Sequence, residues 1–156
     1  MKVLMVCLGN ICRSPMAHGI LRNKLNLLNL DIEVDSAGTS AYHIGDAPDL
    51  RQQETALVKG IDISDLRARQ FTVQDFDDFD LIYAMDDSNY NNMASLARDE
   101  LDHAKLKMIL NENNPEQYLS VPDPYYGGSD GFELVYQLLD EACEVIAKKI
   151  QDGSYR

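Results

Sequence analysis

The stretch 1–28 constrains the fold most, because a strand pattern, a tight turn and a helix pattern follow one another without a break. Lys2–Cys7 is a short, nearly continuous run of apolar strand formers, which is typical of a central parallel strand covered on both faces. Gly9 and Asn10 interrupt this run, and Pro15 stands where a helix readily begins. The apolar residues beyond it recur at helical spacing: Ala17, Leu21, Leu25 and Leu28.

The remaining chain alternates the same two patterns. Strands are predicted over residues 31–34, 80–85 and 105–110, helices over 50–59, 90–97 and 132–150, and loops over 36–43 and 111–124. Strands that alternate with helices predict an α/β fold, a four-stranded parallel sheet flanked by helices on both faces in three layers. We expect one domain over residues 1–156, with its site beyond the carboxyl ends of the strands, where the loops at 7–14, Asp86 and Asp123 fall.

Composition and charge exclude several classes of function. The 156 residues contain 14 Lys and Arg against 26 Asp and Glu, which gives a net charge of −12. A surface this acidic repels nucleic acid and anionic membranes, so neither is an expected partner. No apolar run approaches the roughly 20 residues of a membrane span, and the N-terminus lacks the pattern of a signal peptide. Three cysteines do not make a disulfide scaffold, so we expect a cytoplasmic protein with reduced thiols.

The loop between the first strand and helix has the residues of an anion cradle. Its backbone N–H groups turn toward one point at the positive end of the helix, and Gly9 and Asn10 permit the tight turn. Arg13 can grip two oxygens of a tetrahedral oxyanion, and Ser14 can stabilise a thiolate on Cys7. A lone cysteine at the end of a strand is more often a core residue. The spacing C-x(5)-R-S at a strand-to-helix turn instead favours a nucleophile aimed at phosphorus.

The stretch Cys7–Pro15 resembles the signature of the low-molecular-weight protein tyrosine phosphatases, and the resemblance covers essentially the whole chain. Asp35–Ser40, Ala84–Asp86 and Asp123–Tyr126 follow in the order expected for that family. The resemblance implies a flavodoxin-like fold of the phosphotyrosine phosphatase I type. It also implies an enzyme that hydrolyses phosphotyrosine in proteins, and small aryl phosphates.

The resemblance also assigns catalytic roles. Cys7 attacks phosphorus and forms a phosphocysteine, Asp123 protonates the tyrosine oxygen and later activates water, and Arg13 stabilises the equatorial oxygens. By local sequence alone, an Asp before a Pro is more often a turn residue. The expected phosphate-binding residues are those of the loop: Leu8, Gly9, Asn10, Ile11, Cys12, Arg13 and Ser14.

Residues around this centre receive supporting roles by the same resemblance. Tyr42, Tyr125 and Tyr126 are expected to wall a slot for a phenyl ring, although each could equally be a surface tyrosine. Asn10 and Ser36 resemble the pair that braces the loop in that family, and Ser14 and Asp86 are also expected to support the site.

By the same resemblance, Cys12 is expected to form a reversible disulfide with Cys7 under oxidant, against the alternative of a small packing residue. Cys143 is expected in the core. His18 and the segment Asp65–Leu66 depart from the pattern of the family, which puts the tuning of Cys7 in doubt. We expect no metal and no cofactor, because the histidines have no ligand-like spacing with acids or cysteines.

Three alternatives remain open. Arsenate reductases of this fold need two further relay cysteines, and only Cys143 lies beyond the loop. Protein arginine phosphatases tend to carry Thr where this loop has Ile11, and they lack the paired tyrosines. A non-catalytic, redox-sensing phosphate-binding module would not need both Arg13 and Asp123.

The expected partners are tyrosine-phosphorylated proteins, with basic residues near the phosphotyrosine favoured, and a partner tyrosine kinase. The expected state is a monomer, with a weak dimer as the alternative.

Overall fold

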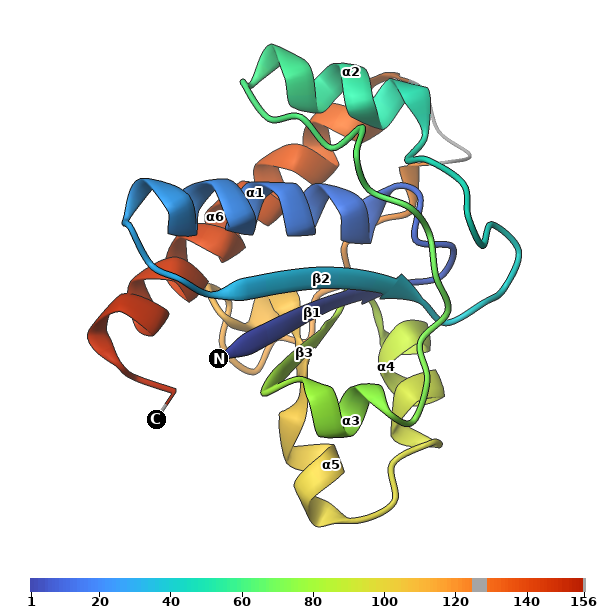
Figure 1. Ribbon diagram of the computed structural model, residues 1–156, viewed down its shortest axis with the longest axis vertical. Helices are drawn as coiled ribbons and strands as arrows, with labels where there is room; N and C mark the ends of the chain where they lie inside the picture. The colour runs from blue at the N-terminus through green and yellow to red at the C-terminus, as the bar shows by residue number, and fades with distance from the viewer. Residues whose placement is uncertain (125–128, 156) are drawn as a thin grey trace.

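The computed structural model describes residues 1–124 and 129–155, and its centre is a parallel sheet of four strands (Figure 1). The strands are β1 (Lys2–Cys7), β2 (Glu33–Gly38), β3 (Leu81–Ala84) and β4 (Leu106–Met108). Their spatial order is β2-β1-β3-β4, and every neighbouring pair is parallel. The first strand therefore lies inside the sheet with a partner on each side, as its continuous apolar pattern predicts.

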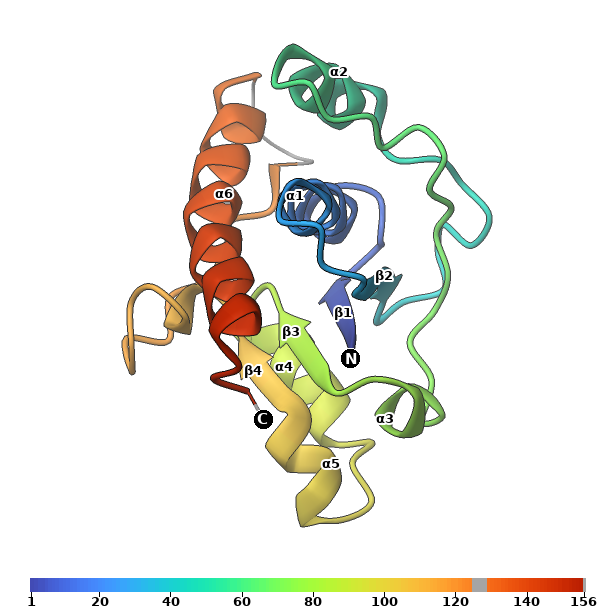
Figure 2. The same cartoon turned by 60° about the vertical axis from the view of Figure 1, so that its left-hand side comes forward.

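Helices cover both faces of the sheet (Figure 2). They are α1 (Arg13–Leu27), α2 (Leu50–Val58), α3 (Asp75–Asp78), α4 (Asp87–Ala94), α5 (Glu100–Lys105) and α6 (Ser129–Asp152), with a short 3-10 helix η1 (Ile109–Asn111). The helices α1 and α6 pack together on one face, with α2 beside them, while α3, α4 and α5 lie on the other. The predicted fold class, three layers around a four-stranded parallel sheet, is confirmed.

The side chains of β1 alternate between two apolar cores. Val3 and Met5 pack with α1 and α6, whereas Leu4 and Val6 pack with the aromatic cluster of the opposite face. All four side chains are fully buried. Because each face of the strand is buried in its own core, the register of β1 is strongly determined, and so is the position of Cys7 at its end.

The closing helix is the most regular element. Its predicted apolar stripe is buried and packs mainly against α1: Phe132, Val135, Leu139, Ala142, Cys143, Ile146 and Ile150. The expected core position of Cys143 is therefore confirmed.

Two of the predicted strand boundaries are wrong. The second strand was expected to end at Val34, but β2 continues to Gly38, because Asp35 to Gly38 pair in register with β1. Residues 35–38 are turn-prone by local sequence, but pairing with β1 outweighs that preference. The last strand was expected over 105–110, but β4 ends at Met108 and the chain turns into η1. The short helices α3 and α5 were not predicted, and at four and six residues they are too short to show periodicity.

Candidate active site

The loop between β1 and α1 lies at the carboxyl edge of the sheet. It begins at Cys7, whose carbonyl accepts from Thr39 N at 2.9 Å, and Ser40 N donates to Leu8 O at 2.9 Å. Gly38 lies directly beneath the loop, since a Cβ there would lie 2.7 Å from Leu8 O. The segment after β2 thus fixes the loop from below, at a distance that only glycine allows.

The Cys7 sulfur faces two groups that can donate to it. Ser14 Oγ lies 3.0 Å from Cys7 Sγ, and the backbone N–H of Asn10 donates to the same sulfur at 3.2 Å. Asn10 Nδ2 also donates to Ser14 Oγ at 2.8 Å, so the single hydroxyl hydrogen of Ser14 remains to be donated either to the sulfur or to the Ala37 carbonyl, 3.3 Å away. Hydrogen bonds of this kind stabilise a thiolate relative to a thiol.

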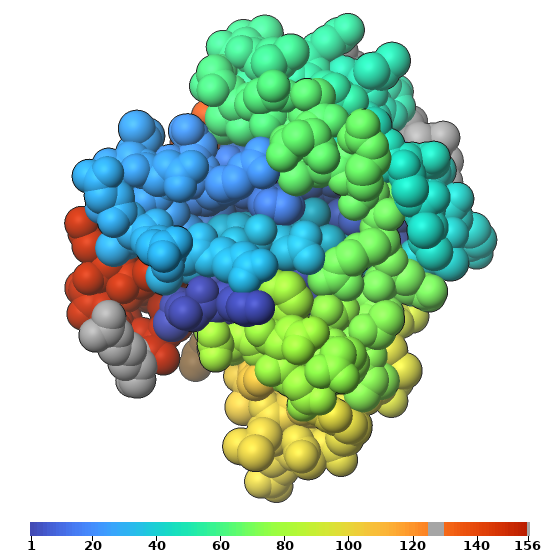
Figure 3. All heavy atoms as spheres, in the orientation of Figure 1, coloured from blue at the N-terminus to red at the C-terminus, as the bar shows by residue number. Residues whose placement is uncertain are grey.

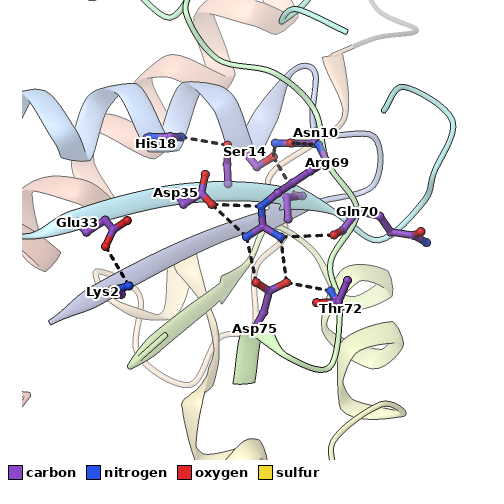
Figure 4. Close-up of polar contacts among 12 residues, drawn as sticks. Lys2, Asn10, Ser14, His18, Glu33, Asp35, Arg69, Gln70, Thr72 and Asp75 are labelled. Atoms are coloured by element: carbon purple, nitrogen blue, oxygen red, sulfur yellow. Dashed lines mark hydrogen bonds and ion pairs between the residues drawn. The ribbon is translucent and has the colours of Figure 1, made fainter. Parts of the chain in front are cut away.

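Asn10 is the brace of the loop. It has a left-handed φ of 57°, which Asn tolerates better than most residues, and its side chain is buried. Its Oδ1 accepts the backbone N–H of Arg69 at 3.1 Å. The Arg69 guanidinium in turn binds Asp35 and the buried Asp75 (Figure 4). The sequence did not single out Arg69, because its part in the site runs through its backbone and through partners remote in the chain.

Arg13 is buried at the first turn of α1, where three loops meet. Its NH1 group donates to Asp86 Oδ2 at 2.6 Å and to Val121 O at 3.1 Å, and its NH2 group lies 3.6 Å from Asp123 Oδ2. Burial opposes the guanidinium charge, but the Cys7 sulfur and Asp86 outweigh it and raise the pKa of Arg13. The guanidinium is therefore a permanent positive charge beside the sulfur.

Asp86 has a second contact besides Arg13. Its side chain caps α4 by accepting the backbone N–H of Asn89 at 2.7 Å. One carboxylate thus caps a helix and contacts Arg13.

The Cys7 loop borders a pocket of about 220 Å³. The residues that line it are Cys7, Leu8, Gly9, Ile11, Cys12, Arg13, Ser40, Tyr42, His43 and Asp123. Of the residues expected at the site, Asn10, Ser14, Ser36 and Asp86 are not in this lining and stand behind it. Ser40 and His43 were not anticipated, although both belong to the small, turn-prone segment that the sequence placed after the second strand.

Cys12 is the N-cap residue of α1 and is buried. Its carbonyl accepts from Gln52 Nε2 at 2.8 Å, a contact between α2 and the loop that the sequence did not indicate. Burial, reinforced by the carboxylate of Asp49, raises the pKa of the Cys12 thiol. Cys7 and Cys12 are both free thiols.

Ser36 lies in β2 and takes a different partner from the one expected. Its Oγ lies 3.0 Å from His18 Nδ1, while Asn10 bonds to Ser14 and Arg69. Burial, and secondarily the charge of Arg22, lowers the pKa of His18 to about 4. The two residues expected to brace the loop together thus lie in separate contacts, and Ser36 orients a buried imidazole on α1.

Tyr125 and Tyr126, two of the residues expected to wall the slot, lie outside the described residues. In residues 1–124 and 129–155, no group of three His, Cys, Asp or Glu side chains is placed to hold a metal ion. Within the same residues, no helix combines the length and apolarity that crossing a bilayer requires.

The fold and the pocket together define a class of protein, the α/β phosphatases with an anion-binding loop at the carboxyl end of a parallel strand. The sequence profile described as "Low molecular weight phosphotyrosine protein phosphatase" matches residues 2–154. The chain belongs to this family, and it is an enzyme, a protein-tyrosine phosphatase.

Individual relatives agree over nearly the full chain. The low molecular weight phosphotyrosine protein phosphatase of Schizosaccharomyces pombe is 43% identical, over 89% of this chain and 90% of that one. A crystal structure of a protein tyrosine phosphatase from Entamoeba histolytica has a TM-score of 0.92 and 36% identity, and the match covers 99% of each chain. A Drosophila arginine phosphatase structure has a TM-score of 0.86 and 35% identity, over 96% of this chain and 98% of that one.

Proposed function

We propose that phosphotyrosine hydrolysis by this chain proceeds through a phosphocysteine on Cys7. The thiolate attacks phosphorus and forms the S–P bond, the P–O bond to tyrosine breaks, and Asp123 gives its proton to the leaving phenol oxygen. Water then attacks phosphorus, the Asp123 carboxylate takes a proton from that water, and the S–P bond breaks to release inorganic phosphate. The observation that carries this proposal is the convergence of Cys7, Arg13 and Asp123 on one pocket.

The loop supplies the electrostatic part of the mechanism. The amides of Leu8 to Ser14 and the Arg13 guanidinium are proposed to bind the equatorial phosphoryl oxygens in both steps. Arg13 NH1 is already held by Asp86 and Val121 O, so the guanidinium plane is fixed before substrate arrives. The contacts with Ser14 Oγ and the Asn10 backbone N–H hold the Cys7 sulfur in place at the base of the loop.

The walls of the pocket are proposed to receive the phenyl ring. Tyr42 lines the pocket and is 83% exposed, so its ring is available at the mouth for stacking. Tyr125 and Tyr126 are assigned to the same slot on the family resemblance alone. Cys12, next to the nucleophile in the loop, is proposed to close a protective disulfide with Cys7 under oxidant.

We infer the cellular setting from the sequence. The chain is proposed to act as a single domain, residues 1–156, in the cytoplasm, as a monomer or weak dimer, on tyrosine-phosphorylated proteins and beside a partner tyrosine kinase. The net charge of −12 argues against nucleic acid as a partner.

Phosphoarginine hydrolysis is the second candidate, and the similarity to the Drosophila arginine phosphatase favours keeping it. Ile11 lines the pocket, and its branched apolar side chain suits a phenyl ring better than a guanidinium group. A binding module without catalysis is the weakest candidate, because it would not need both Asp123 and Arg13 in the pocket.

The test is hydrolysis of an aryl phosphate at about pH 6 with EDTA present, in reduced protein. Cys7→Ser is expected to abolish turnover, and Asp123→Ala to slow it by about 100-fold or more. Turnover by Cys7→Ser at the rate of the unaltered protein would refute the phosphocysteine mechanism. Faster release of phosphate from a phosphoarginine peptide than from a matched phosphotyrosine peptide would favour the second candidate.

A further inference from the structure

The mouth of the pocket contains a histidine–aspartate pair that the catalytic mechanism does not use. His43 follows Tyr42 on the loop 39–48 and lines the pocket, with its side chain about one third exposed. His43 Nδ1 lies 3.2 Å from Asp46 Oδ2, and the Asp46 side chain is 61% exposed. In Figure 3 this loop, in cyan to teal, protrudes at the rim of the molecule.

The pair is held in place from two sides. A Cβ on Gly9 would lie 3.1 Å from the His43 ring, so the ring rests directly on the catalytic loop. The turn is also tied to Ala68, because Gly45 N donates to Ala68 O at 2.8 Å and Ala68 N donates to Asp46 O at 2.9 Å. The backbone of Asp46 is therefore held by Ala68, and its carboxylate adjoins the pocket through the contact with His43, which lines it.

The chemistry of the pair determines what it can bind. A carboxylate only accepts hydrogen bonds, so Nδ1 of His43 carries the hydrogen shared with Asp46. In the neutral ring, Nε2 is then left as an acceptor. The pair thus presents acceptors and a negative charge, which suit a cationic donor.

Asp46 also differs from the other carboxylates near the nucleophile. Asp86 and Asp123 face the guanidinium of Arg13, and Asp49 is paired with Arg51, so a cation offsets the charge of each. Asp46 faces the imidazole of His43 instead. Its charge is therefore available to a substrate side chain at the mouth.

We propose that Asp46, oriented by His43, is a specificity-determining residue that binds a lysine or arginine close to the phosphotyrosine of the substrate. The inference rests on the proposed function, since it places the phosphotyrosine in this pocket. It attributes the preference for a basic substrate residue to the Asp46 carboxylate, and not to the net charge of the protein.

The experiment measures kcat/KM for three phosphotyrosine peptides that differ only in the residues flanking the phosphotyrosine, which are Arg, Gln or Glu. Each value is divided by kcat/KM of the same variant for an aryl phosphate, which removes changes in the chemistry. The unaltered protein is expected to favour Arg over Glu by about fivefold at low salt, as a single charge pair at a solvated rim allows. Asp46→Asn should reduce this ratio to about twofold or less, and Asp46→Lys should invert it.

The matched control is Asp31→Lys. Asp31 is exposed and precedes β2 at the amino end of the sheet, opposite the pocket, so this variant changes the net charge as Asp46→Lys does. The control should keep the ratio of the unaltered protein. The inference is overturned if the Arg-to-Glu ratio changes equally in both Lys variants, or if it stays the same in Asp46→Lys. The proposed function still holds in that case, provided that the protein turns over the aryl phosphate. Absence of aryl phosphate turnover in the unaltered protein would remove both.

Discussion

Replacing Asn10 tests how the catalytic loop is held, because two separate effects meet at this residue. Its buried side chain makes two hydrogen bonds, to Ser14 Oγ and from Arg69 N. Each contributes about 1 kcal/mol to the free energy of unfolding. Its φ of 57° adds a backbone effect, since this region costs alanine about 1 kcal/mol relative to asparagine or glycine, which both adopt it readily.

Two variants separate these effects. Asn10→Ala loses the hydrogen bonds and takes on the backbone strain, so it should lower the free energy of unfolding by about 3 kcal/mol. Asn10→Gly loses only the hydrogen bonds and should lower it by about 2 kcal/mol. Both should slow turnover, because Ser14 loses the donor that orients its hydroxyl toward Cys7.

The assay is urea unfolding followed by far-UV circular dichroism, with the free energy taken from linear extrapolation and kcat measured in parallel. An Asn10→Ala protein at least as stable as Asn10→Gly would refute the backbone argument. A glycine variant as stable as the unaltered protein would refute the hydrogen-bond argument.

Three further predictions follow from buried groups and close contacts. The pKa of His18 lies at about 4 in the folded protein, below its ordinary value, so the unfolded chain binds the extra proton first. The free energy of unfolding should therefore fall by up to about 3 kcal/mol on acidification from about pH 6.5 to 4, and His18→Gln should flatten this slope. Gly38→Ala would push a Cβ against the Leu8 carbonyl and should lower kcat by about tenfold or more, through displacement of the loop. Asp86→Asn has one oxygen where Asp86 uses two, so it cannot both cap α4 and accept from buried Arg13, and it should lower kcat/KM by about three- to tenfold and the free energy of unfolding by about 1–3 kcal/mol.

The predictions for His18 and Gly38 each have a matched control variant. His103→Gln changes an exposed histidine on α5 and should leave the acid slope in place. Gly131→Ala, where the nearest atom to a Cβ lies 3.5 Å away, should leave kcat within about twofold. An acid slope unchanged in His18→Gln, full activity in Gly38→Ala, or an unchanged kcat/KM in Asp86→Asn would each contradict the corresponding argument.

The sequence by itself determined the elements whose information is local. Apolar periodicity identified β1, α1 and α6, because each buries a continuous stripe that its own residues specify. The catalytic loop was equally accessible, since Cys7, Asn10, Arg13 and Ser14 lie within eight residues and the strand-to-helix turn between them brings their groups together. The fold class then followed from the alternation of strands and helices, and the family from the order of the motifs.

Only the tertiary structure decided which distant groups support that loop. Arg69 reaches Asn10 across 59 residues, and the carbonyl of Val121 reaches Arg13 across 108. Ser36 contacts His18, and β2 extends to Gly38 because its last residues pair with β1. The pair of His43 and Asp46 is close in sequence, yet its position at the pocket rim depends on Gly9 and Ala68. Such contacts leave no periodic signal in the chain, because they arise when the carboxyl ends of parallel strands bring separate loops to one edge of the sheet.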